Sequence, residues 1–368
     1  MWYIITKMDR KEKVIIIVGP TASGKSDLGI KIARKISAKG GPASGWQGAE
    51  IISADSRQVY RGMDIGTGKV PRDRIKIHDL RFKNGDSDSR FINRKSYISN
   101  GVIHHLIDVA NPKKVFTASD FKRLGEKAIR EITAKGKISI IVGGTGFYID
   151  ILLNRMQVAE VPPNPKLRAR FNKLTAEHLY KMLQKLDPKK AGIIDRQNKH
   201  RIIRTLEIVL TTKKSSFNTK YSPLNTKYEV LWFGINPGKE MLAKRIKTRL
   251  DKRLCHGMIE EVAKLHNPPT GGGVSWKQLN SFGLEYRWVS RWLMENAKIS
   301  ARGGSAFGGK NDNEKIEKFK NSEFYNRLLT EIIKYSKRQM TWFKKNKEIH
   351  WIKDNKKTIK LIKKFIEI

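Results

Sequence analysis

The stretch GPTASGKS at residues 19–26 constrains the fold more than any other feature, because it matches the phosphate-loop pattern G-x-x-x-x-G-K-[ST]. A β-branched run, VIIIV at 14–18, precedes this loop, and an amphipathic stretch, KSDLGIKIARKI at 25–36, continues from it. The pattern predicts a strand, a phosphate-binding loop and a helix in that order. A chain built around such a unit is expected to fold as an α/β protein.

The residue types in this loop indicate what it binds. We expect Gly19 and Gly24 to let the backbone curl, so that N–H groups and the helix N-terminus face an anion. Lys25 supplies a positive charge, and Ser26 supplies a hydroxyl for Mg²⁺. The loop therefore predicts binding of a diphosphate or triphosphate with Mg²⁺, and does not by itself imply phosphoryl transfer. The predicted phosphate-binding residues are Gly19, Pro20, Thr21, Ala22, Ser23, Gly24, Lys25 and Ser26.

Short apolar runs alternate with helical patterns through much of the chain. A helical pattern covers 118–136, and the runs that predict strands lie at 50–54, 104–109, 138–142 and 230–235. Alternation of this kind predicts a P-loop-type parallel sheet with helices on both faces.

A change of period marks an insertion into this sheet. After VPPNP at 161–165, apolar residues recur at helical spacing as far as RIIRTLEIVL at 201–210. We therefore expect a helical insertion domain at 159–215, and a catalytic core formed by 1–158 and 216–368. Glycine, serine and charged residues dominate three further segments, which we expect to be surface loops: 38–49, 81–96 and 301–315.

The charge of the chain points to a polyanionic partner. Lys and Arg number 75 against 35 Asp and Glu, which gives a formal net charge of +40 and makes nucleic acid the first candidate. The alternative is a lysine-rich bias spread over solvated faces. Residues 331–368 hold 12 basic against 4 acidic residues, with interleaved aromatic side chains that include Trp342 and Phe343. This segment is either a surface that binds RNA or an amphipathic closing helix whose aromatics face the core.

Several classes of protein are disfavoured by composition. The single cysteine, Cys255, excludes an internal disulfide and a four-cysteine zinc site. The sequence has no run of 18 apolar residues, and the charges near its start follow a short apolar stretch, the wrong order for a secretory signal. We expect a cytoplasmic protein that is not inserted in a membrane.

Two more stretches follow predicted strands. Asp55 lies in ISADSRQVYRGMDIGTGK at 52–69, and Thr145 lies in VGGTGFY at 142–148. The carboxyl ends of neighbouring parallel strands share one crevice, so Asp55 is expected near the phosphate loop. There its carboxylate could join the magnesium shell or act as a general base, or it could cap a turn or helix.

Together these stretches resemble one family, the tRNA dimethylallyltransferases, which attach a dimethylallyl group to N6 of adenine 37 in tRNA. The resemblance covers most of the chain in family order and is far more specific than the phosphate loop alone. The matching segments are GPTASGKS, EIISADSRQVYRGMDIGTGK, HHLIDV, FTASDF (116–121), IIVGGTGFYI (140–149), HRIIRTLEIVL (200–210) and KRQMTWFK (337–344).

The resemblance implies roles for the matching residues. The phosphate loop would bind the diphosphate of dimethylallyl diphosphate, with side-chain contacts from Thr21, Lys25 and Ser26. Asp55 would be the general base, Thr145 would line the reaction channel, and Arg249 would steady the leaving diphosphate, with Arg245 as a helper.

The resemblance also implies tRNA contacts, with the insertion gripping the anticodon stem and a monomer as the default assembly. The implied contact residues are Asp55, Ser56, Arg57, Gln58, Thr145, Arg168, His200, Arg201, Ile202, Ile203, Arg204, Lys337, Arg338, Gln339, Met340, Thr341, Trp342, Phe343 and Lys344.

The sequence departs from the family in one stretch. Many relatives have a Gly-Tyr pair where this chain has SFGLEYRW at 281–288, so its contacts with the anticodon loop are not implied. Zinc-finger cysteines of some eukaryotic relatives are missing, which implies a bacterial-type enzyme. Three alternatives stay open: an adenylate isopentenyltransferase, a P-loop kinase of a small metabolite, and an RNA-binding protein with a vestigial loop.

Overall fold

The structure is a computed structural model that describes residues 11–38, 47–73, 97–156, 159, 161–212, 227–269, 271–301, 312–352 and 355–367. The predicted surface loop 81–96 lies outside these residues, as do most of 38–49 and 301–315. Among the described helices, none has the length and apolar character needed to cross a membrane.

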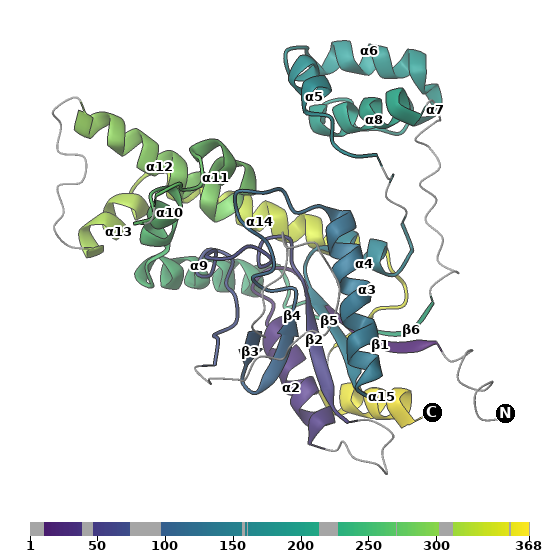
Figure 1. The fold of residues 1–368 in the computed structure, drawn as a ribbon. Coiled ribbons are helices and arrows are strands. Elements are labelled where there is room, and N and C mark those ends of the chain that lie inside the picture. The colour runs from purple at the N-terminus through teal and green to yellow at the C-terminus, as the bar shows by residue number, and fades with distance from the viewer. Residues whose placement is uncertain are drawn as a thin grey trace. The chain divides into compact units, whose positions relative to one another are not determined.

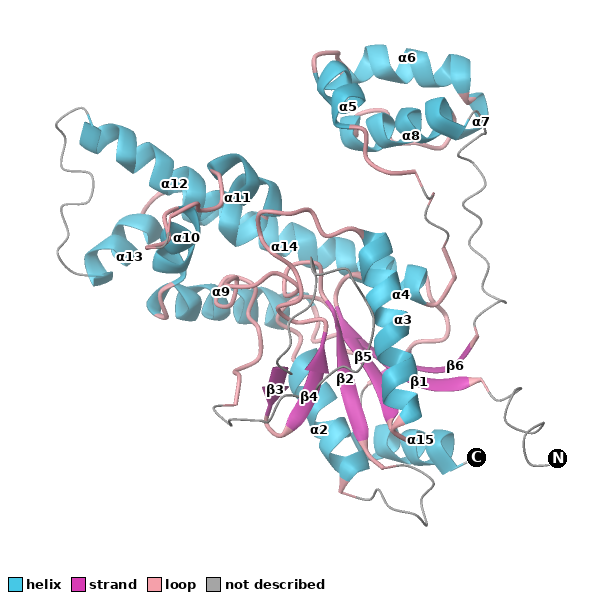
Figure 2. Cartoon of the chain, viewed as in Figure 1, coloured by secondary structure: helices cyan, strands magenta, loops and turns pink. Residues whose placement is uncertain are grey.

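In the described part of the chain, a single sheet has the strand order β3-β4-β2-β5-β1-β6-β7. Figure 2 shows this sheet from β3 to β6. Neighbouring strands pair in parallel except for β3 and β4, which are antiparallel. Val18 is paired with Gly143, and Gly143 with Ala54, so three central strands end level at one edge. The strands are β1 (Glu12–Val18), β2 (Ala49–Ala54), β3 (Tyr97–Ser99), β4 (Val102–His105), β5 (Ile138–Gly143), β6 (Tyr228–Gly234) and β7 (His350–Trp351).

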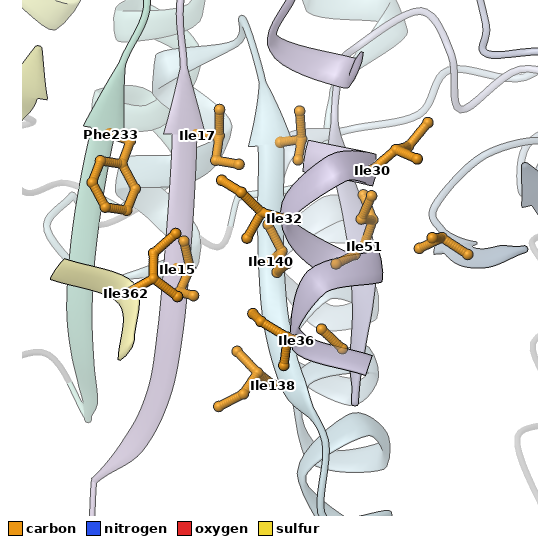
Figure 3. Close-up of a cluster of buried hydrophobic side chains, with 14 residues drawn as sticks. Ile15, Ile17, Ile30, Ile32, Ile36, Ile51, Ile138, Ile140, Phe233 and Ile362 are labelled. Atoms are coloured by element: carbon orange, nitrogen blue, oxygen red, sulfur yellow. The ribbon is translucent and has the colours of Figure 1, made fainter. Parts of the chain in front are cut away.

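Branched apolar side chains explain why these strands form the core. Ile15 and Ile17 of β1 alternate with Ile16, so both faces of the strand are apolar, and all three are fully buried. On one face, helix α2 (Lys25–Ser37) and Ile362 of helix α15 (Asn355–Glu367) pack over β1, β2 and β5 (Figure 3).

Helices cover both faces because two crossovers run in opposite directions. The chain passes from β1 through α2 to β2, and from β4 through helix α3 (Ala118–Ala134) to β5. Since such connections are right-handed, α2 and α3 lie on opposite faces. The expected α/β fold with helices on both faces is confirmed.

The expected strand at 104–109 is shorter in the structure. Strand β4 ends at His105, and Leu106 (φ +62°) and Asp108 (φ +58°) leave the extended conformation. Positive φ angles are incompatible with a continued strand ladder. The buried amine of Lys69 forms an ion pair with the Asp108 carboxylate, which holds this turn in place.

The chain divides into two compact units: Met1–Ile149 with Lys227–Ile368, and Asp150–Thr226. The predicted insertion boundaries, 159 and 215, fall within the second unit. That unit contains the helices α5 (Pro165–Asn172), α6 (Ala176–Leu186), α7 (Pro188–Ala191) and α8 (Lys199–Thr212) (Figure 1). Its own apolar cluster includes Phe171, Leu179, Leu183 and Ile202, which are almost wholly buried.

The first unit also contains a helical region after the sheet. Helix α14 packs against α9 and α12, and α11 packs against α12. The basic segment 331–368 contains the end of α14, strand β7 and helix α15. The remaining helices are α4 (Gly146–Leu152), α9 (Lys239–Cys255), α10 (Met258–His266), α11 (Trp276–Phe282), α12 (Leu284–Ala301), α13 (Asp312–Lys320) and α14 (Glu323–Phe343).

Candidate active site

The phosphate loop joins β1 to α2 with an open helix N-terminus. Gly24 is the N-terminal boundary residue of α2 at φ +88°, and no side chain caps the helix there. A Cβ added to Gly19 would lie 2.7 Å from Ser23 Oγ and 2.9 Å from the carbonyl oxygen of Ile235, so only glycine fits. Unpaired N–H groups and the positive end of the helix dipole therefore favour an anion at this loop.

Cationic side chains converge on the same loop. Arg249 Nη2 of α9 donates to Thr21 Oγ1, and Arg245 Nη1 lies 3.5 Å from the carbonyl oxygen of Ser23. Lys25 Nζ donates to the Pro20 carbonyl at 3.2 Å. Burial, together with the charge of Arg249, lowers the pKa of Lys25 to about 8. Burial and the charge of Arg253 likewise lower the pKa of Arg249. These cations are desolvated and repel one another, an arrangement that an anionic ligand relieves.

Asp55 and Thr145 lie side by side, as expected for residues that follow adjacent parallel strands. The backbone N–H of Ser56 donates to Thr145 Oγ1 at 3.3 Å. Asp55 Oδ1 accepts from the N–H groups of Arg57 (2.8 Å) and Gln58 (3.3 Å), so the carboxylate does cap a turn through one oxygen. Its Oδ2 accepts no hydrogen bond from the described residues. The cap fixes the orientation of the carboxylate and leaves one oxygen for chemistry.

Two cavities meet at Asp55. The first, here called the phosphate-loop cavity, is lined by Lys25, Ser26 and Gly68, and by apolar residues of β2 and β5. The second, here called the basic cavity, is lined by five arginines and by Phe282, Tyr286 and Tyr335. The arginines of the basic cavity are Arg57, Arg249, Arg253, Arg287 and Arg338. Both cavities are lined by Thr21, Asp55, Thr67 and Arg249.

The two cavities differ chemically. Most side chains that line the phosphate-loop cavity are polar, with the apolar Ile51, Val70, Ile107 and Val142 among them. Burial together with the charge of His105 lowers the pKa of His104 on this lining to about 4. His104 is therefore neutral there and adds no charge. In the basic cavity, the Arg57 guanidinium lies 5.8 Å from the Phe282 ring centre, and that of Arg338 lies 5.8 Å from Tyr335. Guanidinium groups and aromatic rings together favour a phosphorylated, flat ligand such as a nucleotide.

Gln339 has a role that the sequence did not reveal. It is 7% exposed, and its Oε1 accepts from the Thr21 N–H at 2.8 Å while its Nε2 donates to the Gly144 carbonyl at 2.9 Å. The side chain therefore clamps the phosphate loop to the turn after β5. Trp342 packs against Gly146, where an added Cβ would lie 2.3 Å from the indole.

The structure places the remaining implied tRNA contacts in different environments. Phe343 is core, at 2% exposure, whereas Lys337, Arg338, Thr341 and Lys344 are exposed and Met340 is half-buried. In the insertion unit, Ile202 and Ile203 are core residues, and His200 and Arg201 are exposed. Arg168 and Arg204 both bind the buried carboxylate of Glu207, at 2.8 Å and 2.6 Å.

Sequence reasoning also missed Arg253, the third member of a row on α9. Arg245, Arg249 and Arg253 are spaced four residues apart, so they share one face of the helix. This spacing was available in the sequence as a signal. The partner of Arg253, the Glu285 carboxylate at 2.6 Å, lies in the stretch 281–288 and comes from a different helix.

The described residues contain no group of three or more His, Cys, Asp or Glu side chains arranged to hold a metal ion. Ser26 nevertheless lines the phosphate-loop cavity together with Asp55. Mg²⁺ keeps several water ligands and is commonly held by one or two protein oxygens plus substrate phosphates. The donor set of this cavity therefore fits an ion bound jointly with a diphosphate.

Comparison with known proteins places the chain in a family. A family model described as IPP transferase matches residues 93–346. The tRNA dimethylallyltransferase of Staphylococcus carnosus is 33% identical over 360 residues, which cover 96% of this chain and 94% of that protein. A tRNA dimethylallyltransferase 1 from Citrifermentans bemidjiense is 34% identical, with 94% and 93% covered.

Solved structures agree with the sequence comparison. The tRNA isopentenylpyrophosphate transferase of Bacillus halodurans has a TM-score of 0.56 and 28% identity, and the match covers 97% of this chain and 96% of that one. A eukaryotic dimethylallyltransferase acting on tRNA has a TM-score of 0.63 and 25% identity, with 90% and 69% covered. The resemblance inferred from the motifs is thus confirmed over nearly the whole length, and the chain belongs to the IPP transferase family.

Proposed function

We propose that this protein transfers a dimethylallyl group from dimethylallyl diphosphate to N6 of adenine 37 in tRNA, releasing diphosphate. One observation carries the proposal: two chemically different cavities share Thr21, Asp55, Thr67 and Arg249. One suits a small diphosphate with an apolar tail, and the other suits a nucleotide. The names of the relatives, which are tRNA dimethylallyltransferases, support this pairing of substrates.

The cations of the phosphate loop suit a leaving group. When the bond between the allylic carbon and the diphosphate breaks, negative charge develops on the departing oxygens. Lys25 and Arg249 are already fixed and desolvated, so they stabilise that charge without reorganising. Ser26 and the diphosphate oxygens would hold Mg²⁺, which when bound supplies further charge stabilisation to the leaving diphosphate.

Asp55 suits the role of general base. The exocyclic amine of adenine is a weak nucleophile because its lone pair is delocalised into the ring. As N6 attacks the allylic carbon, it must lose a proton, and Asp55 Oδ2 is held at the junction of the two cavities to accept it. Thr145 lies beside Asp55 and would line the same passage.

The basic cavity suits an extruded nucleotide. A base stacked in an anticodon loop cannot reach Asp55, so adenine 37 must leave the stack. The half-buried Tyr335 offers a ring surface for the base, and Arg57 and Arg338 line the same cavity, where they would contact phosphates. The exposed Lys337 and Lys344 extend a cationic surface along α14, and the Thr341 hydroxyl lies exposed between them.

The direct experiment is mass spectrometry of unmodified tRNA after incubation with the protein, Mg²⁺ and dimethylallyl diphosphate. We expect the mass of a dimethylallyl group on adenine 37. Modification of free AMP, ADP or ATP without modification of tRNA would instead identify an adenylate isopentenyltransferase. Phosphoryl transfer from ATP, with dimethylallyl diphosphate left intact, would identify a kinase and overturn the proposal.

The Asp55→Ala variant tests the base. We expect transfer to fall about 10²- to 10⁴-fold, the usual contribution of a positioned base. The affinity for tRNA should remain close to that of the unchanged protein, because the carboxylate is not a phosphate anchor. Asp120→Ala, which removes a capping carboxylate of α3, is a control for loss of an acidic cap. Unchanged turnover by Asp55→Ala would remove Asp55 from this role.

A further inference from the structure

A three-residue segment, here called the partition, contributes to the lining of both cavities. Gly66 lines the basic cavity, Gly68 lines the phosphate-loop cavity, and Thr67 between them lines both. On one side of this segment, the Glu261 carboxylate accepts from the backbone N–H of Gly66 at 3.0 Å. The remaining contacts of this segment determine how firmly it is held between the two cavities.

Besides Gln58, whose Nε2 donates to the Gly68 carbonyl at 3.2 Å, Arg253 anchors this segment. Its Nη1 donates to the Gly66 carbonyl at 2.9 Å and to Glu285 Oε1 at 2.6 Å. A Cβ added to Gly68, whose φ is +62°, would lie 1.9 Å from Arg253 Nη2, so the guanidinium rests directly against the backbone of the partition. Arg253 and Glu285 are 8% and 6% exposed. One buried side chain thus joins the partition to α9 and α12.

The burial of Arg253 is energetically unfavourable. We therefore infer that this side chain serves to position the partition rather than to stabilise the fold. Arg253 Nη2 is buried with no hydrogen-bond partner among the described residues, and the side chain lies near two other cations, Lys25 and Arg249. A buried ion pair is often no more stable than apolar residues of the same volume. The planar guanidinium, however, can donate to Gly66 and Glu285 in one rigid geometry, which a flexible amine reproduces poorly.

We propose that Arg253 is a positioning residue for the transfer reaction, which holds the 66–68 partition so that the donor diphosphate and the acceptor nucleotide meet beside Asp55. Arg249 lies one helical turn from Arg253 on α9, about 6 Å along the axis, and touches Thr21. The same anchor therefore fixes the partition relative to the cation that contacts the phosphate loop. The inference rests on the proposed function.

The partition controls the fate of the allylic carbon. In the productive reaction, N6 of adenine forms the new C–N bond, the C–O bond to diphosphate breaks, and the N6 proton passes to Asp55. If the partition shifts, water reaches the same carbon: a C–O bond to water forms, the C–O bond to diphosphate breaks, and the water proton is released to solvent. The products are then dimethylallyl alcohol and diphosphate, and tRNA stays unmodified.

The test measures the ratio of dimethylallyl alcohol to modified tRNA, using isotopically labelled dimethylallyl diphosphate. For Arg253→Met we expect kcat for transfer to fall about tenfold or more, because small misplacements of reacting groups are costly, and the alcohol fraction to rise about tenfold. Arg253→Lys keeps the charge but not the forked donor, so it should be intermediate. Lys252→Met, an exposed neighbour on α9, should keep the ratio of the unchanged protein.

The double variant Arg253→Met with Glu285→Gln separates positioning from charge burial. It removes both charges of the Arg253–Glu285 pair together, so circular dichroism should show a folded protein, yet the alcohol fraction should stay high. A normal ratio in folded Arg253→Met, Arg253→Lys or double variants would overturn the inference. Absence of tRNA modification by the unchanged protein would instead overturn the proposed function.

Discussion

The cations of the phosphate loop and the arginines of the insertion unit have opposite electrostatic environments. Around the loop, Lys25, Arg249 and Arg253 outnumber the nearby carboxylates, and the pKa values of Lys25 and Arg249 are lowered. In the insertion unit, Arg168 and Arg204 share Glu207, which is fully buried. There, hydrogen bonds from Arg168, the Asn164 N–H and Arg204 outweigh burial and lower the carboxyl pKa to about 2.

Basic residues therefore serve two different functions in this protein. An excess of buried cations is unfavourable in the empty protein and becomes favourable when an anion binds. A carboxylate surrounded by arginines is satisfied without a ligand and fixes the local structure. We therefore propose that Lys25 and Arg249 serve ligand binding, and that Arg168 and Arg204 in the first place hold the insertion helices together.

The Lys25→Met variant tests the ligand-binding half of the comparison, with the largest expected effect. Removing a fixed charge that stabilises a leaving group should lower kcat/KM for dimethylallyl diphosphate about 10²- to 10³-fold. Steady-state kinetics with tRNA in excess measures this. Lys31→Met, an exposed residue on the same helix, controls for loss of a positive charge. Equal losses in both variants would show that general electrostatics, rather than the loop, accounts for the effect.

The Glu207→Ala variant tests whether the Glu207 carboxylate and its two arginines hold the insertion helices together. It leaves two partly buried arginines without their carboxylate, so we expect the insertion unit to lose about 3–5 kcal/mol of stability. Hydrogen–deuterium exchange of 165–212 measures this locally, because the two units need not unfold together. Donor binding in the absence of tRNA should not change. The exchange rate of Glu207→Gln should lie between those of the unchanged protein and Glu207→Ala. If Glu207→Ala exchanges at the rate of the unchanged protein, Glu207 does not hold the insertion helices together.

Acid should have the same effect as Glu207→Ala, somewhat more weakly. The folded pKa of Glu207, about 2, lies below its ordinary value of 4.5, so its stabilisation is fully present above pH 4.5 and is lost as pH falls towards 2. The magnitude is of the order of a few kcal/mol. Hydrogen exchange at pH 5 and pH 3 should show opening of α8 around Glu207, and in Glu207→Ala this pH-dependent difference at α8 should be smaller.

The sequence predicted the local parts of the site better than its long-range parts. The phosphate loop is contiguous, and Asp55 meets Thr145 because parallel strands end at one edge, so both followed from pattern and topology. The contacts of Gln339 with Thr21, 318 residues away, and of Arg253 with Glu285, 32 residues away, depend on how α9, α12 and α14 pack. Glu207 likewise reaches Arg168 across 39 residues, and no local pattern marks that pairing.

The smallest expected effect concerns exposed cations that belong neither to the phosphate loop nor to the insertion unit. Lys337 and Arg338 lie on the exposed face of α14, and we expect each to contact one tRNA phosphate. Each phosphate contact releases counterions on binding, so the double change Lys337→Met with Arg338→Met should lower the slope of log affinity against log salt by about one to two.

Filter binding between 50 and 300 mM salt measures the slope, with Lys318→Met and Lys320→Met on α13 as a charge-matched control. Because these side chains would contact RNA phosphates rather than the reacting atoms, losing them should lower tRNA affinity more than turnover of bound tRNA. An unaltered slope would mean that this face of α14 does not contact the RNA backbone, and that the positive charge used for binding lies elsewhere.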